Sequence, residues 1–218
     1  VATLEDTAVT VQVLDNDSDI DGDTLSVTVA TAPNGSVTIN GDSSLTYTPN
    51  ADFNGTDSIS YTLSDGTTTD TGAVAVTVTS VNDQPSSVLL AGPTVAEDSG
   101  ASTTAGFSTA TFGPADENGQ TATYAVANNN STLFAAQPSI STSGELSFTP
   151  ADNANGTATV TLTLVDSGGD SNGGNDTSIT QSFVITVTAV NDAPIADDDA
   201  VATLEDTAVT VQVLDNDS

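Results

Sequence analysis

Five aspartates occupy every second position between Asp15 and Asp23, and Gly22 is the only glycine among them. Carboxylates at this spacing repel one another by roughly a few kcal/mol per pair, so a folded loop that holds them needs a cation. The chain contains 30 Asp and Glu residues and no Lys, Arg or His, which gives a formal net charge of −30. The counter-charge must come from solution, and a hard divalent ion such as Ca²⁺ matches carboxylate and carbonyl ligands. The run therefore predicts a calcium-binding loop.

Several residue types are absent, and their absence excludes most other chemistry. Without Cys or His, the chain has no thiol nucleophile, no imidazole base and no ordinary zinc site. Without Lys or Arg, it lacks a Schiff-base amine and the basic surface that nucleic acids bind. A carboxylate pair of the glycosidase type stays open, but the acids cluster in polar segments rather than in an apolar pocket. We predict no enzymatic activity, no nucleic-acid partner and no membrane span in this segment.

The chain contains a long repeat. Residues 201–218 are identical to residues 1–18, which indicates a repeating unit of 200 residues and a parent protein built as an array of such units.

A weaker repeat lies inside the unit. Three landmarks of the first half return in the same order in the second half: Glu5-Asp6-Thr7 as Glu97-Asp98-Ser99, residues 45–56 as 146–157, and residues 81–85 as 190–194. We interpret the halves as homologous domains joined by linkers stiffened at Pro85 and Pro194. The predicted organisation is one β-sandwich over 1–84, a second over 85–193, and over 194–218 a linker with the first strands of the next repeat.

Alternation of apolar and polar residues predicts the secondary structure. It is clearest at 8–13, 25–29, 58–63 and 73–78, and it is typical of half-buried strands. Turn-forming Asn-Gly and Asp-Gly pairs separate these segments. About seven short strands per domain predict an all-β protein made of tandem, immunoglobulin-like Greek-key β-sandwiches. The Gly-rich residues 167–176 are predicted to form a flexible surface loop, with an additional ion site as the alternative.

A Greek-key sandwich sends alternate loops to opposite ends, which gathers the acids of each domain into two groups. At one end of domain one we expect Asp15, Asp17, Asp19, Asp21, Asp23 and Asp65. At the other end we expect Glu5, Asp6, Asp52 and Asn54.

Domains stacked end to end would bring such groups together at their linkers. At the first junction the second group would face Asn82, Asp83, Asp116, Glu117 and Asn118. At the second junction the predicted ligands are Glu97, Asp98, Asp152, Asn191, Asp192 and Asp198, with Glu205, Asp215 and Asp217 of the next copy beyond them. Each junction would hold at least one Ca²⁺, which takes six to eight oxygen ligands.

Four motifs carry a family resemblance: Leu4-Glu5-Asp6-Thr7, residues 17–25, Leu45-Thr46-Tyr47-Thr48-Pro49 and Val81-Asn82-Asp83-Gln84-Pro85. With them the chain resembles cadherin repeats, and most closely the bacterial cadherin-like tandem repeats of giant secreted adhesins. The motifs span domain one, and domain two matches more loosely. Because residues 116–120 replace the longer acidic run there, we expect fewer or weaker ions at the first junction.

The resemblance implies a calcium-stiffened extracellular rod, secreted or on the cell surface, that serves as spacer or filament shaft in adhesion or matrix formation. Its partners would be neighbouring repeats, with cell-surface glycans or matrix contacted through other domains. Two alternatives stay open: a carbohydrate- or partner-binding adhesion module, and a subunit of an extracellular filament assembled by strand exchange. Tyr47, Tyr61, Phe148 and Phe183 alternate along predicted strands, which favours core packing over sugar binding.

Overall fold

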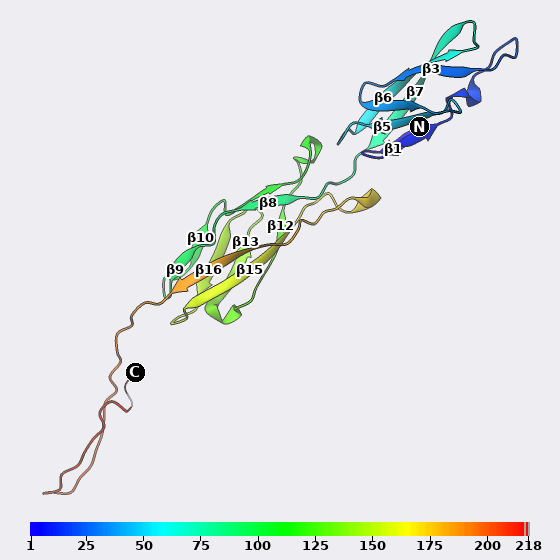
Figure 1. The fold of residues 1–218 in the computed structure, drawn as a ribbon. Helices are drawn as coiled ribbons and strands as arrows, with labels where there is room; N and C mark the ends of the chain where they lie inside the picture. Colours follow the sequence, from blue (N-terminus) through cyan, green and yellow to red (C-terminus); the bar gives the residue numbers. More distant parts are fainter. Residues whose placement is uncertain (216, 218) are drawn as a thin grey trace.

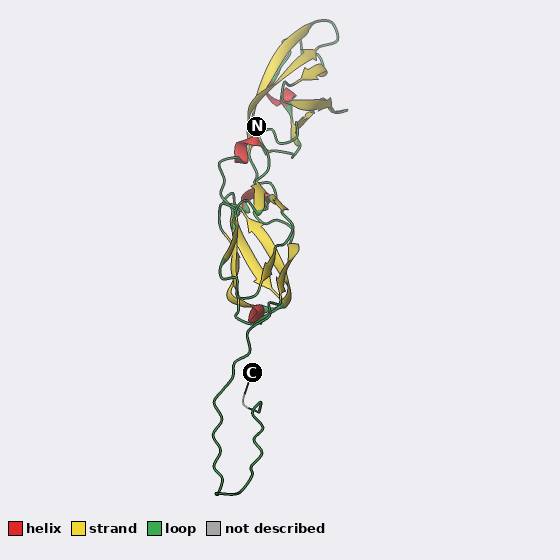
Figure 2. Cartoon of the chain, turned by 90° about the vertical axis from the view of Figure 1, so that its left-hand side faces the viewer, coloured by secondary structure: helices red, strands yellow, loops and turns green. Residues whose placement is uncertain are grey.

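The structure, a computed structural model, describes residues 1–215 and residue 217. Two β-sandwiches follow one another along an elongated molecule, and an extended segment leaves the second sandwich at the end opposite the first (Figure 1). This arrangement confirms the predicted all-β, tandem sandwich fold. The helical pieces are single short turns in loops (Figure 2).

Domain one contains two sheets with the strand orders β1-β7-β6-β3 and β2-β5-β4. Its elements are β1 Ala2–Leu4, β2 Val9–Val11, η1 Val13–Asn16, β3 Ser26–Thr31, β4 Gly35–Ile39, β5 Leu45–Pro49, β6 Gly55–Ser64 and β7 Thr69–Thr79. Alternate residues of β5 and β6 point between the sheets, and Leu45, Tyr47 and Ile59 are fully buried there. This alternation is the physical basis of the sandwich, because it gives each strand one apolar face.

Domain two repeats the plan with one added ladder: its sheets are β12-β15-β16-β9, β10-β14-β13 and β11-β8. Its strands are β8 Ser86–Leu89, β9 Thr94–Ala96, β10 Ser102–Thr104, β11 Ser108–Thr111, β12 Thr123–Asn128, β13 Phe134–Ile140, β14 Leu146–Pro150, β15 Gly156–Val165 and β16 Gln181–Thr188. The short 3-10 turns are η2 Ala115–Glu117, η3 Ser131–Leu133 and η4 Ser171–Gly173.

Aromatic side chains pack in the domain cores. Phe107 and Phe183 lie with ring centroids 4.5 Å apart, and Phe148 is also buried. Tyr47 and Tyr61 are buried in the core of domain one. The prediction that the alternating aromatics serve core packing is therefore confirmed.

The C-terminal segment differs from its expected form. The sequence predicts the first strands of a further repeat within 194–218, whereas the described part of this segment contains no strand. In domain one the same sequence forms β1 and β2 by pairing with β7 and β5. Both partner strands lie outside the 18 residues that are repeated, so this sequence alone does not contain the strands with which it pairs.

Candidate metal centre

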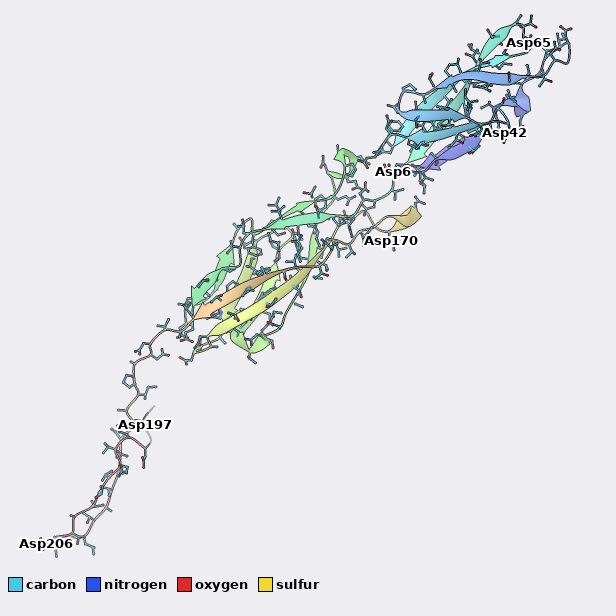
Figure 3. All side chains as sticks on the ribbon, viewed as in Figure 1. Asp6, Asp42, Asp65, Asp170, Asp197 and Asp206 are labelled. Atoms are coloured by element: carbon cyan, nitrogen blue, oxygen red, sulfur yellow. The ribbon has the colours of Figure 1, made fainter. Side chains whose placement is uncertain are left out.

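The loops of domain one gather at two ends, and the acidic residues lie on them. Asp65 lies at the outer end of domain one, whereas Asp6 lies at the junction with domain two, where Asp170 approaches from the other side (Figure 3). The first junction is therefore built from both domains and from the linker between β7 and β8.

Glu5 anchors the linker to domain one. Its side chain is only 5% exposed, and its Oε1 accepts a hydrogen bond from the backbone N–H of Val81. Domain two repeats this contact at its own far end, where Glu97 Oε1 accepts the N–H of Val190 at 2.8 Å. Each carboxylate also binds the side-chain amide of an Asn in a neighbouring loop, Asn54 for Glu5 and Asn155 for Glu97, the latter at 3.1 Å to Oε2.

Asp6 lies in the left-handed region, with a φ of 53°, and its Oδ1 accepts the N–H of Asp52 at 3.3 Å. In domain two, Asp98 accepts the N–H of Asn153 at 3.0 Å. The structure therefore pairs Asp98 with Asn153, the neighbour of the predicted ligand Asp152. The end of domain two carries one carboxylate fewer at this contact than the end of domain one.

Domain two completes the junction through η2. The Oε1 of Glu117 accepts the backbone N–H of Asp83 at 2.9 Å, and Asp116 Oδ2 accepts the side-chain amide of Asn54 at 2.7 Å. Carboxylates from domain one, the linker and domain two consequently meet in one place. They are Glu5, Asp6, Asp52, Asp83, Asp116 and Glu117.

Two buried oxygens at this junction have no hydrogen-bond donor. They are Glu117 Oε2 and Gln120 Oε1, and both residues line a pocket of about 190 Å³ together with Asn82 and Asp116. A buried acceptor without a donor costs about 1–3 kcal/mol, and more if it is charged. Such a pair of oxygens is what a cation would satisfy.

Mutual repulsion and burial disfavour the charged forms of three junction carboxyls. Desolvation, with the nearby charges of Asp116 and Asp83, raises the pKa of Glu5 despite its hydrogen bonds. Desolvation and the charges of Asp52, Asp6 and Asp116 raise the pKa of Asp83. Desolvation followed by the charge of Asp83 raises the pKa of Glu117, against the hydrogen bond from the Asp83 N–H. The junction lacks positive charge of its own.

These shifts predict how the stability of the calcium-free protein depends on pH. A carboxyl whose pKa is raised on folding stabilises the fold below its unfolded pKa, and that contribution is lost as pH rises through the folded pKa. With ordinary values of 4.5 for Glu5 and Glu117 and 3.8 for Asp83, lowering the pH from about 7 to about 5 should raise the melting temperature in chelator. Calorimetry checks this.

Calcium should reduce or reverse the pH effect, because bound carboxylates must be deprotonated. The opposite shifts belong to Asp65 and Asp42, whose pKa values are lowered by hydrogen bonds from Thr68 and Ser44. Protonation of Asp65 and Asp42 destabilises the fold only as the pH falls through their lowered pKa values, which lie below the range from pH 7 to pH 5. A melting temperature in chelator that falls between pH 7 and pH 5 would contradict the expected repulsion at the junction.

The Gly-rich loop of domain two, residues 167–176, is hydrogen-bonded to the linker. Asn82 Nδ2 donates to Asp166 Oδ1 at 3.1 Å and to the carbonyl of Asn175 at 3.1 Å, and the N–H of Asn175 donates to the Asn82 carbonyl at 2.9 Å. Asn82 Oδ1 accepts the side-chain amide of Gln120 at 2.7 Å. The prediction of a merely flexible loop omitted this role, since residues 167–176 hold the linker against domain two.

At the outer end of domain one, Asp17, Asp19 and Asp65 line one pocket of about 200 Å³ together with Asp70. Asp19 Oδ1 accepts the N–H groups of Asp21 and Asp23 at 2.9 and 3.0 Å. Tyr61 donates to Asp17 Oδ2 at 2.8 Å, and burial together with this carboxylate raises the pKa of Tyr61 to about 12. The outer end therefore presents a second acidic group.

The remaining predicted ligands are spread along exposed backbone. Asn118 is exposed beside η2, and the following are exposed as well: Asp15, Asp152, Asn191, Asp192, Asp198, Glu205 and Asp215. Asp217 lies beside Asp197, whose N–H donates to Asp217 Oδ1 at 2.9 Å. Among the described residues, the predicted ligands of the second junction in this list are not brought together; Asn118 belongs to the first junction and Asp15 to the outer end of domain one.

Two junction residues were missed by the sequence analysis. Asp166 is 7% exposed and follows β15 as Asp65 follows β6, which is the signal that could have identified it. Gln120 contributes an amide oxygen and has no counterpart in the motifs of domain one.

Within the described residues, no three acidic side chains form a ready-made metal site. The donor set at the first junction nevertheless fits a hard cation, because it consists of carboxylate and amide oxygens and includes the buried oxygens of Glu117 and Gln120. Bound there, Ca²⁺ would supply the positive charge that the chain lacks. Glu5, Asp83, Asp116 and Glu117 are the side chains best placed to hold it.

The fold and the acidic junction define a class: tandem immunoglobulin-like sandwiches joined end to end, as in cadherins. Residues 1–77 match the family described as bacterial Ig domain. Domain one thus matches a bacterial Ig family, and the tandem fold is that of cadherin repeats, as the resemblance predicted. Domains of this kind are structural modules that are typically extracellular or on the cell surface. None of the described helices has the length and apolar character that crossing a membrane requires.

Solved cadherin structures are similar in fold. Repeats EC1-2 of human protocadherin-24, form II, align over 79% of this chain and 86% of theirs, with 16% identity and a TM-score of 0.58. A second structure of these repeats aligns over 80% and 86%, with 14% identity and a TM-score of 0.54. Drosophila N-cadherin EC1-4 aligns over 80% and 43%, with 14% identity and a TM-score of 0.50. No curated protein matches the chain.

Proposed function

We propose that this chain is a calcium-stiffened structural repeat of an extracellular adhesin or surface filament, where it acts as a spacer or shaft. One observation carries the proposal: a junction made from two domains and a linker gathers carboxylates around the buried, donor-free oxygen Glu117 Oε2. The chain contains no Lys, Arg or His to neutralise them. A dissolved cation that binds both domains would restrict their relative motion, since hinging would separate its ligands.

Small-angle scattering with calcium and with chelator tests the proposal. Calcium is expected to increase the maximum dimension and to narrow the distribution of shapes, because the carboxylates then hold the domains in line. Added NaCl at matched ionic strength is the control, since it screens repulsion without supplying a multidentate ion. A maximum dimension that is the same in calcium and chelator would defeat the proposal.

The alternative of a carbohydrate-binding module has no specific observation in its favour. Sugar platforms need exposed aromatic rings, whereas Tyr47 and Phe148 are buried and Phe53 packs against the core of domain one. The proposal of a structural repeat includes the prediction that the chain is not an enzyme. The partners of such a repeat would be neighbouring repeats of the same chain or filament.

A further inference from the structure

The chain contains six Asn-Gly pairs, which begin at Asn34, Asn40, Asn54, Asn118, Asn155 and Asn172. In such a pair the backbone nitrogen of the glycine, after loss of its proton, can attack Cγ of the asparagine, because glycine has no Cβ to hinder the approach. The new N–Cγ bond closes a five-membered succinimide, and the side-chain nitrogen takes up a proton and leaves as ammonia. Water then opens the ring at either carbonyl, which gives Asp or isoAsp. Because the dipeptide is the same six times, differences in its reactivity depend largely on the fold.

The fold restrains four of these pairs. Three asparagines donate hydrogen bonds from their side-chain amides: Asn40 to Ser44 Oγ at 2.8 Å, Asn54 to Asp116 Oδ2 at 2.7 Å and Asn155 to Glu97 Oε2 at 3.1 Å. In the fourth pair, Gly35 belongs to β4 opposite Pro49 and lies against Tyr47, since an added Cβ would be 2.4 Å from Cε2 of that ring. Attack in these pairs first requires a hydrogen bond to break or a strand end to open.

The pairs at Asn118 and Asn172 lack these restraints. Both asparagines are exposed, and among the hydrogen bonds of the described residues none involves either side-chain amide. A Cβ added at Gly119 or Gly173 would meet nothing within 4 Å in the part of the chain that the structure describes. These two asparagines and the glycines that follow them are therefore free to adopt the geometry of attack.

Both unrestrained pairs flank the pocket of the first junction. Asn118 lies in the chain between Glu117 and Gln120, whose side-chain oxygens are buried without donors. The N–H of Gln120 donates to the carbonyl of Glu117 at 3.0 Å, which closes a turn with Asn118 and Gly119 at its centre. Asn172 lines the same pocket from the Gly-rich loop. A chemical change at either asparagine therefore acts on the junction.

We propose that Asn118 and Asn172 are sites of spontaneous deamidation, through which the first junction gains carboxylates as the protein ages. Each conversion replaces a neutral amide by a negative charge. IsoAsp at position 118 also adds one carbon to the backbone of the turn, which shifts Gln120, whose amide binds Asn82 Oδ1 at 2.7 Å. Ageing should thus loosen the hold on the linker. The reaction needs only water and no bound cation, so it is independent of the proposed function.

A time course on the full chain in chelator tests the proposal. The pH is mildly alkaline and sampling extends over weeks, because nearby carboxylates slow the loss of the proton from the glycine nitrogen. Samples are digested with pepsin at acid pH, since the chain has no Lys or Arg for trypsin. A restraint of about 1.4 kcal/mol slows a reaction about tenfold. Mass spectrometry should therefore show conversion at Asn118 and Asn172 at least about ten times faster than at the four restrained pairs.

Two controls separate the fold from the dipeptide. In urea all six pairs should convert at similar rates, because the restraints are then absent. Gly119→Ala keeps Asn118 and enters open space, so it should slow conversion at Asn118 about tenfold and leave Asn172 unchanged. Conversion of Asn118 and Asn172 no faster than at the restrained pairs of the folded protein would overturn the proposal. An unchanged rate at Asn118 in Gly119→Ala would overturn it as well.

Discussion

Replacing Glu117 with Gln is expected to stabilise the calcium-free protein and, at the same time, to weaken calcium binding. The amide keeps Oε1 as acceptor for the Asp83 N–H. Its NH₂ group replaces Oε2, the buried oxygen without a donor, and faces a neighbourhood that includes the charges of Asp116 and Asp166. Removal of one buried like charge should raise the free energy of unfolding in chelator by about 1–2 kcal/mol.

The same substitution removes an anionic ligand from the proposed site. Calcium affinity should fall by about 10- to 100-fold, the range found when groups around metal sites are altered. Calorimetric titration measures the affinity, and thermal unfolding in chelator measures the stability. A destabilised calcium-free variant would contradict the repulsion, and an unchanged affinity would remove Glu117 from the ligand set.

Glu205→Gln is the matched control for this prediction. It makes the same chemical change at an exposed position, next to Asp206 at the far tip of the C-terminal segment (Figure 3). Neither the stability of the domains nor the affinity at the first junction should change. The contrast between the two variants separates loss of a ligand from the general effect of one charge fewer on a chain of net charge −30.

The fold was predictable because its cause is local. Alternation over 58–63 gives β6 one apolar face, and the structure buries Ile59 and Tyr61 of that face. The ends of the strands also determine where loop residues go, so Asp6 and Asp52 were expected together and are hydrogen-bonded. The strand order decides which loops lie at each end of a sandwich, and the repeated motifs allowed that order to be predicted.

Other features depend on contacts that no local pattern encodes. Val13 is 3% exposed and Val213 is 56% exposed although the same residues precede them, because burial depends on the strands that pack against each copy and not on the local sequence. The hydrogen bond from the Asn82 side chain to the carbonyl of Asn175, in the loop of residues 167–176, joins positions 93 residues apart. Glycine content indicated a loop there, but not the polar groups that the loop would bind.

Asn82→Ala is expected to loosen the first junction even when calcium is present. The change removes donors to Asp166, which is 7% exposed, and leaves that carboxylate with the N–H of Gly168 at 2.9 Å. It also leaves the side-chain amide of Gln120 without its acceptor. Loss of several hydrogen bonds, those to Asp166 and Gln120 partly buried and one of them to a charged group, should lower the free energy of unfolding of domain two by about 2–3 kcal/mol.

Asn191→Ala is the control that the chain itself provides. Asn191 holds the same place in the second Val-Asn-Asp-X-Pro motif but is exposed, and its amide donates only locally, to the carbonyl of Asp192 at 3.0 Å. Its replacement should change stability by less than about 0.5 kcal/mol. Equal effects of the two substitutions would show that the Gly-rich loop does not hold the linker.

Combining Asn82→Ala with chelator separates the two sources of stiffness. One dye on Thr38→Cys and one on Thr161→Cys, both exposed and on different domains, report the distribution of interdomain distances. If the loop and the cation each restrain the linker, Asn82→Ala alone or chelator alone should broaden the distance distribution modestly. The two changes together should broaden it more than additively, because each restraint limits the motion that the other leaves free. A distribution that broadens fully in chelator alone would assign the stiffness to the cation and leave the loop without a mechanical role.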